Sequence, residues 1–294
     1  MNYRIFNEKM SVMIHSKGAE LNSIRKGNTE YLWQGDPAFW EGQAPNLFPY
    51  VGRMTDKSYT YQGNRYQMDI HGFVKDYDLT VCDHGRDYIT FCLDSDHGTM
   101  RQYPFSFTYL ISYRLEGSRL EISYEVTNRD DKRMYFGIGG HPGFRVPICD
   151  GEKFEDYSLK FQESVHPLRI GFSPTCFVDN TKTPFELGDD NCLNLKHNLF
   201  DQDAVVLEGA GDTVILLDKR RHAVLSLNFP DMPYLGIWHT PKMDAPFICL
   251  EPWASLPSSQ GVVEELTMQK SLIMLDEGKT YVNDWSIRSE ERRV

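Results

Sequence analysis

The sequence lacks several features that would assign it to a common class of protein. No uninterrupted apolar run approaches the roughly 18 residues of a membrane span. Residues 1–13 contain no apolar core of signal-peptide length, because Arg4, Glu8 and Lys9 interrupt them. There is no dense block of Lys and Arg, and the 294 residues carry a formal charge of −11. We therefore expect a cytoplasmic protein without a membrane as partner. Nucleic acid is not expected as a partner either, since proteins usually bind phosphate backbones with a basic face.

Cysteine is scarce and scattered. The sequence has no C-x-x-C pair and no tight framework of cysteines. We therefore expect reduced, mostly buried thiols and no structural zinc site. The six cysteines are Cys82, Cys92, Cys149, Cys176, Cys192 and Cys249.

Long amphipathic helices are nearly absent, and the best short candidate covers residues 193–200. The sequence shows alternation with a period of two instead. Apolar and polar side chains alternate over residues 105–115 and again over 120–126, with Gly117 between the two runs, which predicts a long antiparallel hairpin. The alternation over residues 59–68, around Gly63, predicts a second hairpin.

The same alternation continues to the end of the chain, which predicts an all-β protein. Turn signals are spread along the whole length, and no linker, low-complexity tract or fixed repeat divides it. We therefore predict one domain, residues 1–294, built as a large antiparallel β-sandwich with few short helices. The further predicted strands are 88–93, 214–217, 224–229, 234–239, 247–251 and 281–287.

Four short stretches place polar residues beside glycine, proline and aromatic residues at predicted strand ends, where functional sites usually lie. They are Phe-Pro-x-Val-Gly-Arg at 48–53, His-Gly-Phe at 71–73, Gly-His-Pro-x-Phe at 140–144 and Leu-Glu-Pro-Trp at 250–253. In this order and at these separations, the motifs resemble those of the aldose 1-epimerase (galactose mutarotase) family. The resemblance is closest to its shorter bacterial LacX-like branch and covers nearly the whole chain.

The resemblance implies a β-sandwich with a sugar cleft across one sheet, and it implies roles for individual residues. Glu251 would be the base toward the anomeric hydroxyl O1, and His141 the acid toward the ring oxygen O5. His71 would donate a hydrogen bond near O5, and Arg53 would anchor sugar hydroxyls.

The family also uses an acidic residue for the distal sugar hydroxyls, which falls within residues 200–205. We place it at Asp203, because the apolar residues from Val205 onward fit a following strand, and we keep Asp201 as the alternative. Arg53 has a second possible partner in Asp56, with which it could form an ordinary surface ion pair.

Interconverting α and β anomers requires removal of the O1 proton, protonation of O5, ring opening, rotation about C1–C2 and ring closure. An unperturbed carboxylate has a pKa of about 4.3 and an imidazole about 6.5. Near neutral pH the first is a ready acceptor, and an acidic neighbour can keep the second charged. One acid and one base suffice, so we expect neither cofactor nor metal.

Glu251 lies in a run whose alternation places it on the same face as Phe247 and Cys249, away from Ile248 and Leu250. A carboxylate on a partly buried strand face needs a reason, and binding or catalysis supplies one.

Tryptophans could stack against sugar faces. Of Trp33, Trp40, Trp238 and Trp253 we select Trp238 and Trp253, and Trp238 with His239 replaces a sugar-binding glutamine of the longer relatives. His239 is left unassigned. We expect the remaining six histidines to face solvent: His15, His84, His97, His166, His197 and His222.

Three alternatives stay open. Lys75 could hold the phosphate of a hexose 6-phosphate, as in epimerases related to the family. The same cleft could bind a sugar without turnover, as a binding module or sensor. His71, His141 and Glu251 could form a two-histidine, one-carboxylate metal site. The sequence predicts a small sugar as the partner but leaves its identity and the oligomeric state open.

Overall fold

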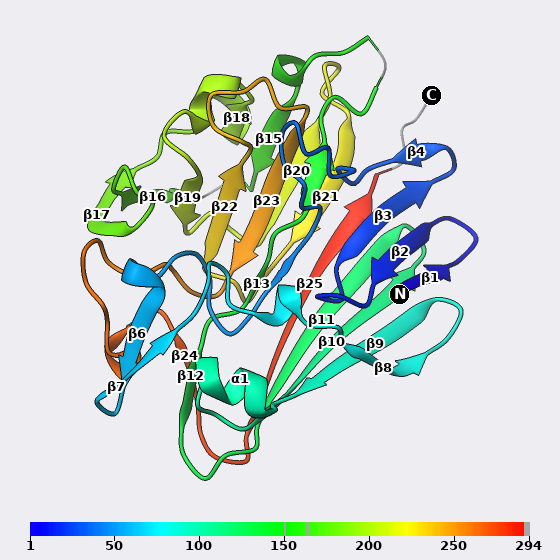
Figure 1. Ribbon diagram of the computed structural model, residues 1–294. Helices are drawn as coiled ribbons and strands as arrows, with labels where there is room; N and C mark the ends of the chain where they lie inside the picture. Colours follow the sequence, from blue (N-terminus) through cyan, green and yellow to red (C-terminus); the bar gives the residue numbers. More distant parts are fainter. Residues whose placement is uncertain (150, 163–164, 291–294) are drawn as a thin grey trace.

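The computed structural model describes residues 1–149, 151–162 and 165–290, and antiparallel sheets dominate it (Figure 1). The largest sheet has nine strands in the order β18-β15-β20-β21-β25-β11-β10-β9-β8. Their bounds are β8 (Thr80–His84), β9 (Tyr88–Asp94), β10 (Phe107–Glu116), β11 (Arg119–Asn128), β15 (Ser158–Phe161), β18 (Cys192–Asn194), β20 (Thr213–Leu217), β21 (Ala223–Asn228) and β25 (Thr280–Ser289).

The second large sheet has eight strands and carries the candidate site. Seven follow the order β17-β16-β19-β22-β23-β13-β5, and the eighth, β14, pairs with β23. Their bounds are β5 (Asn46–Leu47), β13 (Gly139–Gly140), β14 (Gly143–Arg145), β16 (Leu168–Phe172), β17 (Val178–Pro184), β19 (Val205–Glu208), β22 (Tyr234–Trp238) and β23 (Phe247–Trp253).

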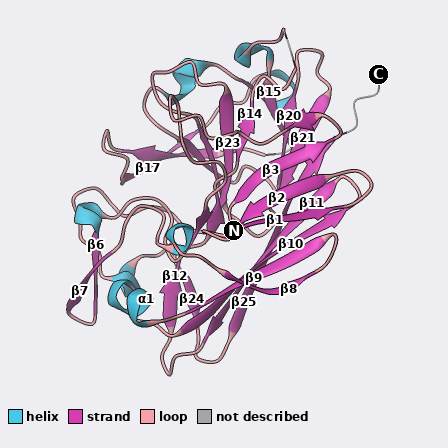
Figure 2. Ribbon diagram, turned by 45° about the vertical axis from the view of Figure 1, so that its right-hand side comes forward, coloured by secondary structure: helices cyan, strands magenta, loops and turns pink. Residues whose placement is uncertain are grey.

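Three small sheets and a few single-turn helices complete the described chain (Figure 2). The small sheets are formed by β1 (Asn2–Phe6), β2 (Ser11–His15), β3 (Leu21–Lys26) and β4 (Thr29–Glu30), by β6 (Ser58–Tyr61) and β7 (Asn64–Gln67), and by β12 (Met134–Phe136) and β24 (Ile273–Leu275). The helices are α1 (His97–Gln102) and the 3₁₀ turns η1 (Thr55–Lys57), η2 (Val74–Asp76), η3 (Phe154–Asp156), η4 (Asp189–Asn191), η5 (His197–Phe200) and η6 (Leu266–Met268).

The structure confirms the predicted hairpins. β10 and β11 pair in a register that places Glu116 opposite Arg119, and Gly117 at the turn has a φ of 59°. β6 and β7 pair around Gly63, whose φ of 78° suits a residue without Cβ. The predicted helix over residues 193–200 is wrong, because its first residues pair as β18 with β15 and only its end forms η5.

The main core lies between the two large sheets, which confirms the predicted β-sandwich. Alternate side chains of β10, such as Tyr109 and Ile111, are fully buried together with Ile248 and Leu250 of β23. Fully burying one such aliphatic side chain contributes about 1.5–3 kcal/mol. This core cluster contains residues from Ile5 to Ile287. Its extent favours a single domain, although the single domain itself stays a prediction.

The opposite face of β23 carries two smaller apolar clusters. One contains Trp33, Phe247 and Cys249, and the other contains Leu47 and Trp253. Because side chains alternate along a strand, Glu251 shares this face and lies between Cys249 and Trp253. The sheet therefore presents a carboxylate between two apolar patches.

Within the described residues, none of the helices is long and apolar enough to cross a membrane. All six cysteines are free, as expected. The expectation that most are buried is wrong: only Cys192 and Cys249 are, whereas Cys82 is exposed on the edge strand β8 and the other three are half-buried.

Candidate functional site

The carboxyl group of Glu251 lies in the middle of the eight-stranded sheet. All seven residues of β23 are buried, and the exposed fraction of Glu251 is 1%. The predicted alternation is confirmed, since Ile248 and Leu250 point into the main core and Cys249 lies on the other face. On the neighbouring strand β22, Gly236 pairs with Glu251, and a Cβ at Gly236 would lie 3.2 Å from the Glu251 Cβ. Glycine thus leaves space beside the carboxylate.

His141 lies on the other side of Glu251. The register that pairs Gly139 with Trp253 and Gly143 with Cys249 also sets His141 opposite Glu251. Directly opposite side chains on antiparallel strands are close neighbours. The His141 Nε2 lies 3.2 Å from the Glu251 Oε2. Sheet pairing therefore brings together two residues that are 110 positions apart.

Burial controls the proton affinities of this pair. It raises the pKa of Glu251 well above its ordinary value, helped by the negative charge of Asp203. It lowers the pKa of His141 to about 4, although Asp203 acts in the opposite direction. The expectation that an acidic neighbour keeps His141 charged near neutral pH is wrong for the ligand-free site, because desolvation outweighs the charge of Asp203.

Two polar atoms of the pair have no hydrogen-bond partner among the described residues. They are the Glu251 Oε2 and the His141 Nδ1, both inaccessible to solvent. An unpartnered buried polar atom costs about 1–3 kcal/mol. A buried atom of this kind is typically satisfied by an ordered water or a ligand.

His71 is fixed against the loop that carries Arg53. The His71 N–H donates to the Gly52 carbonyl oxygen at 2.9 Å, and the Gly52 N–H donates to the His71 Nδ1 at 3.1 Å. The acceptor role of Nδ1 leaves the proton of the neutral ring on Nε2. The ring lies edge-on to His141, with centroids 5.4 Å apart. Burial, and then the electrostatic effect of His141, Lys75 and Arg53, lower the pKa of His71.

Arg53 and Asp203 lie together at the more exposed side of the site. The Arg53 Nη1 lies 4.0 Å from the Asp203 Oδ2. The alternative partner Asp56 pairs instead with Arg65. Asp201, the alternative to Asp203, is exposed at the end of η5. The contact with Arg53 thus favours Asp203 over Asp201.

Cys176 is a neighbour of Asp203 that no sequence motif indicates. Its thiol donates to the Asp203 Oδ2 at 2.6 Å. Burial raises the pKa of this thiol, and Asp203 raises it further while Arg53 lowers it. The residues lie in separate segments, so only the folded chain brings them together.

Aromatic side chains cover the His141 ring. Trp40 stacks on it at a centroid distance of 5.0 Å and an angle of 30°, and Trp238 meets it edge-on at 5.7 Å. Trp238 was selected from the sequence and Trp40 was not, because no motif surrounds Trp40. Trp253 lies on the other side, where its indole lowers the pKa of Glu251 and its ring is 6.5 Å from His71.

Lys75 stands apart from the pair of Glu251 and His141. Its ammonium group forms a 2.5 Å ion pair with Asp76 in the same 3₁₀ turn, η2. Its charge still contributes to lowering the pKa of His71. Asp76 therefore already neutralises the one cation that the sequence offered for a phosphate.

The histidine predictions are partly wrong. His197 stacks on Phe154 at 4.2 Å, and its Nδ1 lies 3.1 Å from the Nε2 of His239, which is fully buried. His15 is half-buried, and its Nδ1 accepts the Lys17 N–H. Four histidines are exposed as expected: His84, His97, His166 and His222.

A cluster of metal-ligating atoms occurs at the site, but with a different membership from the predicted one. In the described part of the chain, ligand atoms of His141, Cys249 and Glu251 lie within 4.8 Å of one another. Cys249 thus takes the place that the metal alternative gave to His71. His71 instead uses its Nδ1 to accept the Gly52 N–H.

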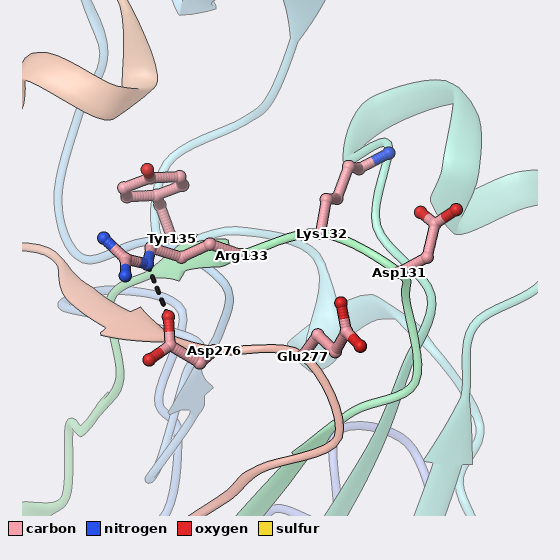
Figure 3. A pocket seen from close by; sticks show the side chains of 6 residues that line it. All are labelled: Asp131, Lys132, Arg133, Tyr135, Asp276 and Glu277. Carbon is pink, nitrogen blue, oxygen red and sulfur yellow. Dashed lines mark hydrogen bonds and ion pairs between the residues drawn. The ribbon is translucent and has the colours of Figure 1, made fainter.

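A depression of about 510 Å³ elsewhere on the surface contains none of these residues (Figure 3). It lies beside β12 and β24, and its Arg133 Nε donates to the Asp276 Oδ1 at 2.6 Å. It contains none of the residues of the sequence motifs, so it is a poor candidate for the functional site. Its lining residues are Asp131, Lys132, Arg133, Tyr135, Asp276 and Glu277.

The sequence and the fold have known counterparts. The sequence model of the aldose 1-epimerase family matches residues 1–287, so the chain belongs to this family. It is 33% identical to the plasmid-encoded protein LacX of Lactococcus lactis subsp. lactis over 293 residues, which cover 95% of this chain and 97% of LacX.

Two solved structures have almost the same fold. One is a galactose mutarotase-like protein from Lactobacillus casei, with a TM-score of 0.93 and 31% identity over 99% of this chain and all of that chain. The other is a galactose mutarotase related enzyme from Lactobacillus acidophilus, with a TM-score of 0.92 and 32% identity over 99% of this chain and 98% of that chain. The family and these neighbours support an epimerase or mutarotase role on a small sugar.

Proposed function

We propose that the protein is an aldose 1-epimerase that interconverts the α and β anomers of a free aldohexose such as galactose or glucose. One observation carries the proposal: among the described residues the buried Glu251 Oε2 has no hydrogen-bond partner, and it lies 3.2 Å from the His141 Nε2. Mere sugar binding does not need a buried carboxyl and a buried imidazole in contact, whereas proton exchange between two sugar oxygens does.

The reaction needs one proton in the pair at all times. Ring opening begins with the proton on His141 and the negative charge on Glu251: the carboxylate takes the O1 proton, and the imidazolium gives its proton to O5. The open-chain sugar then faces a protonated Glu251 and a neutral His141. After rotation about C1–C2, the same transfers run backwards and close the ring to the other anomer.

The pKa shifts favour the second of these two states in the ligand-free protein, because burial disfavours both charges. The two states differ only in the position of one proton, and the two groups lie 3.2 Å apart. A bound sugar supplies polar atoms to both groups and thereby favours the ion pair. We therefore propose chemistry that needs neither cofactor nor metal, in a protein that we place in the cytoplasm.

The remaining residues would bind the sugar. His71 would donate from Nε2 to an oxygen near O5, and Arg53 with Asp203 would hold hydroxyls at the more exposed side. Trp238 would pack against an apolar face of the sugar ring. The pairing of Lys75 with Asp76 favours a neutral sugar over a phosphorylated one.

The test is polarimetric relaxation of freshly dissolved α-D-glucose and α-D-galactose with and without the protein. Accelerated relaxation of either sugar supports the proposal and identifies a substrate. If neither is accelerated, the same measurement on glucose 6-phosphate tests the phosphorylated alternative. If none of the three sugars relaxes faster with the protein, but calorimetry shows that a sugar binds, the protein would be a sugar sensor and not an enzyme.

A further inference from the structure

Cys249 is the buried thiol nearest to the proposed acid–base pair, and that chemistry does not use it. It precedes Glu251 by two residues on β23, so both side chains leave the same face of the sheet. Its register partners are Gly143 on one side and Trp238 on the other. Its Sγ, the Glu251 carboxylate and a ring nitrogen of His141 lie within 4.8 Å of one another.

We propose that His141, Cys249 and Glu251 form a binding site for a divalent cation that accepts a thiolate ligand, such as Zn²⁺, and that the bound cation blocks the acid–base pair. The inhibition by the cation rests on the proposed function, whereas the binding of the cation does not. Sulfur, imidazole and carboxylate are the three ligand types that Zn²⁺ prefers in proteins.

The spacing of the nitrogen and oxygen ligand atoms suits a small cation, and the Cys249 Sγ lies within 4.8 Å of both. Zinc binds nitrogen and oxygen at about 2.0–2.2 Å, so adjacent ligands of a tetrahedral site lie roughly 3.3–3.5 Å apart. The His141 Nε2 and the Glu251 Oε2 are 3.2 Å apart, close to this value. The Glu251 Oε2 is buried and has no hydrogen-bond partner in the described part of the chain, and a metal bond would satisfy it.

The charges also balance. Burial raises the pKa of Cys249, and the charge of Glu251 raises it further, so a thiolate beside a carboxylate is unfavourable in the ligand-free site. A divalent cation compensates both negative charges and leaves a neutral buried centre. Binding forms one metal–sulfur, one metal–oxygen and one metal–nitrogen bond. It releases to solvent the thiol proton and the proton that Glu251 and His141 share.

Occupation of this site would stop turnover. The Glu251 oxygen that receives the O1 proton and the His141 nitrogen that serves O5 would both bond to the cation. A chelator that removes the cation would restore the rate. Turnover would thus be carried out by the protein whose site holds no cation.

The experiment uses the full chain without an affinity tag. Equilibrium dialysis against zinc chloride measures bound zinc, and a cobalt chloride titration detects the thiolate-to-cobalt charge-transfer band. We expect one metal per chain in the wild type. Cys249→Ser should lose the band and bind zinc at least roughly 100-fold more weakly, since the loss of even an outer-shell partner costs 10- to 100-fold. Cys192→Ser removes the other buried cysteine and should change neither result.

A second control tests whether zinc binds instead to the contacting imidazoles of His197 and His239. His197→Gln should leave zinc binding intact, although His197 and His239 lie 3.1 Å apart. Equal zinc binding and an unchanged cobalt band in Cys249→Ser would overturn the assigned ligands. Wild type that retains no zinc would overturn the site itself.

Polarimetric relaxation tests the blocking part. Zinc should slow the wild-type rate, and Cys249→Ser should need correspondingly more zinc for the same fractional loss. Zinc-loaded wild type that turns over normally would refute blocking. If the metal-free wild type shows no turnover, the proposed function fails, while the dialysis and the cobalt band still decide whether the site exists.

Discussion

His141 lies opposite Glu251 beside the eight-stranded sheet, with the His141 Nε2 3.2 Å from the Glu251 Oε2. It lies between β13 and β14, and both strands pair with β23. Gly236 on β22 pairs with Glu251 from the other side. These strand pairings on both sides of His141 set the distance between the two groups that would exchange protons.

Glu251→Gln should reduce turnover by roughly 100- to 10,000-fold, the usual contribution of an acid–base group. The amide keeps the size of the side chain but cannot accept the O1 proton. Polarimetric relaxation measures the rate, and circular dichroism with sugar calorimetry checks that fold and binding persist. A near-native rate would exclude Glu251 as the base.

Arg53→Ala should raise the sugar concentration for half-maximal rate by roughly 10- to 100-fold, since a hydrogen bond from a charged group contributes about 1.5–3 kcal/mol. The maximal rate should change little, because Arg53 contacts Asp203 and not the acid–base pair. Arg65→Ala removes a similar exposed arginine, paired with Asp56, and serves as the control. The same concentration dependence in both variants would place Arg53 outside the sugar site.

The rate should have a bell-shaped pH dependence that reports on the pair as a unit. With the pKa of Glu251 raised, the first proton of the pair goes to Glu251, and its second proton goes to His141 at a pKa of about 4. Activity should therefore fall below about pH 4, and it should fall again on the alkaline side when the single proton is lost. An acid limb centred instead at the ordinary imidazole pKa of about 6.5 would contradict this description.

Gly236→Ala should lower the maximal rate. A Cβ there would lie 3.2 Å from both the Glu251 Cβ and the Trp253 Cζ2, so the Glu251 side chain or the Trp253 ring must give way by a few tenths of an ångström. Overpacking of this kind costs about 1–3 kcal/mol. Gly188→Ala is the matched control, because its Cβ would approach the Cys192 carbonyl oxygen equally closely, away from the site. Equal rates in the two variants would show that Glu251 tolerates displacement.

His239 should make the fold sensitive to acid. Burial, followed by the charge of His197, lowers its pKa to about 4, against about 6.5 in the unfolded chain. The unfolded state therefore binds the proton more readily, and stability that is complete above pH 6.5 is lost as the pH falls toward 4. His239→Gln should show a smaller drop in Tm over this window. An identical drop would assign the acid sensitivity to other groups.

The sequence was sufficient for the longer strands, such as β10, β11, β23 and β25, and for the face of Glu251, because a period of two is a local property. Alternation along β23 places Glu251 with Phe247 and Cys249, and the structure agrees. The pairing of β23 with the segment around His141 depends on contacts between residues 110 positions apart. No local pattern encodes it, and only the resemblance to a family brought the two residues together in advance.

Other features could not be predicted for the same reason. The stacking of Trp40 on His141 and the thiol contact of Cys176 with Asp203 join distant segments without motifs. The lowered pKa of His141 follows from the extent of its burial, which composition does not reveal. His197 was misjudged because its contacts with Phe154 and His239 arise only in the folded chain.

The paired hydrogen bonds between Gly52 and His71 have a mechanical consequence. Arg53 follows Gly52 directly, so the guanidinium and the His71 ring are anchored to the same short piece of backbone. A substitution that displaces one of them transmits its displacement to the other. The free-energy effects of changes at Arg53 and His71 on sugar affinity should therefore be non-additive, and the two loops should respond to a ligand as one body.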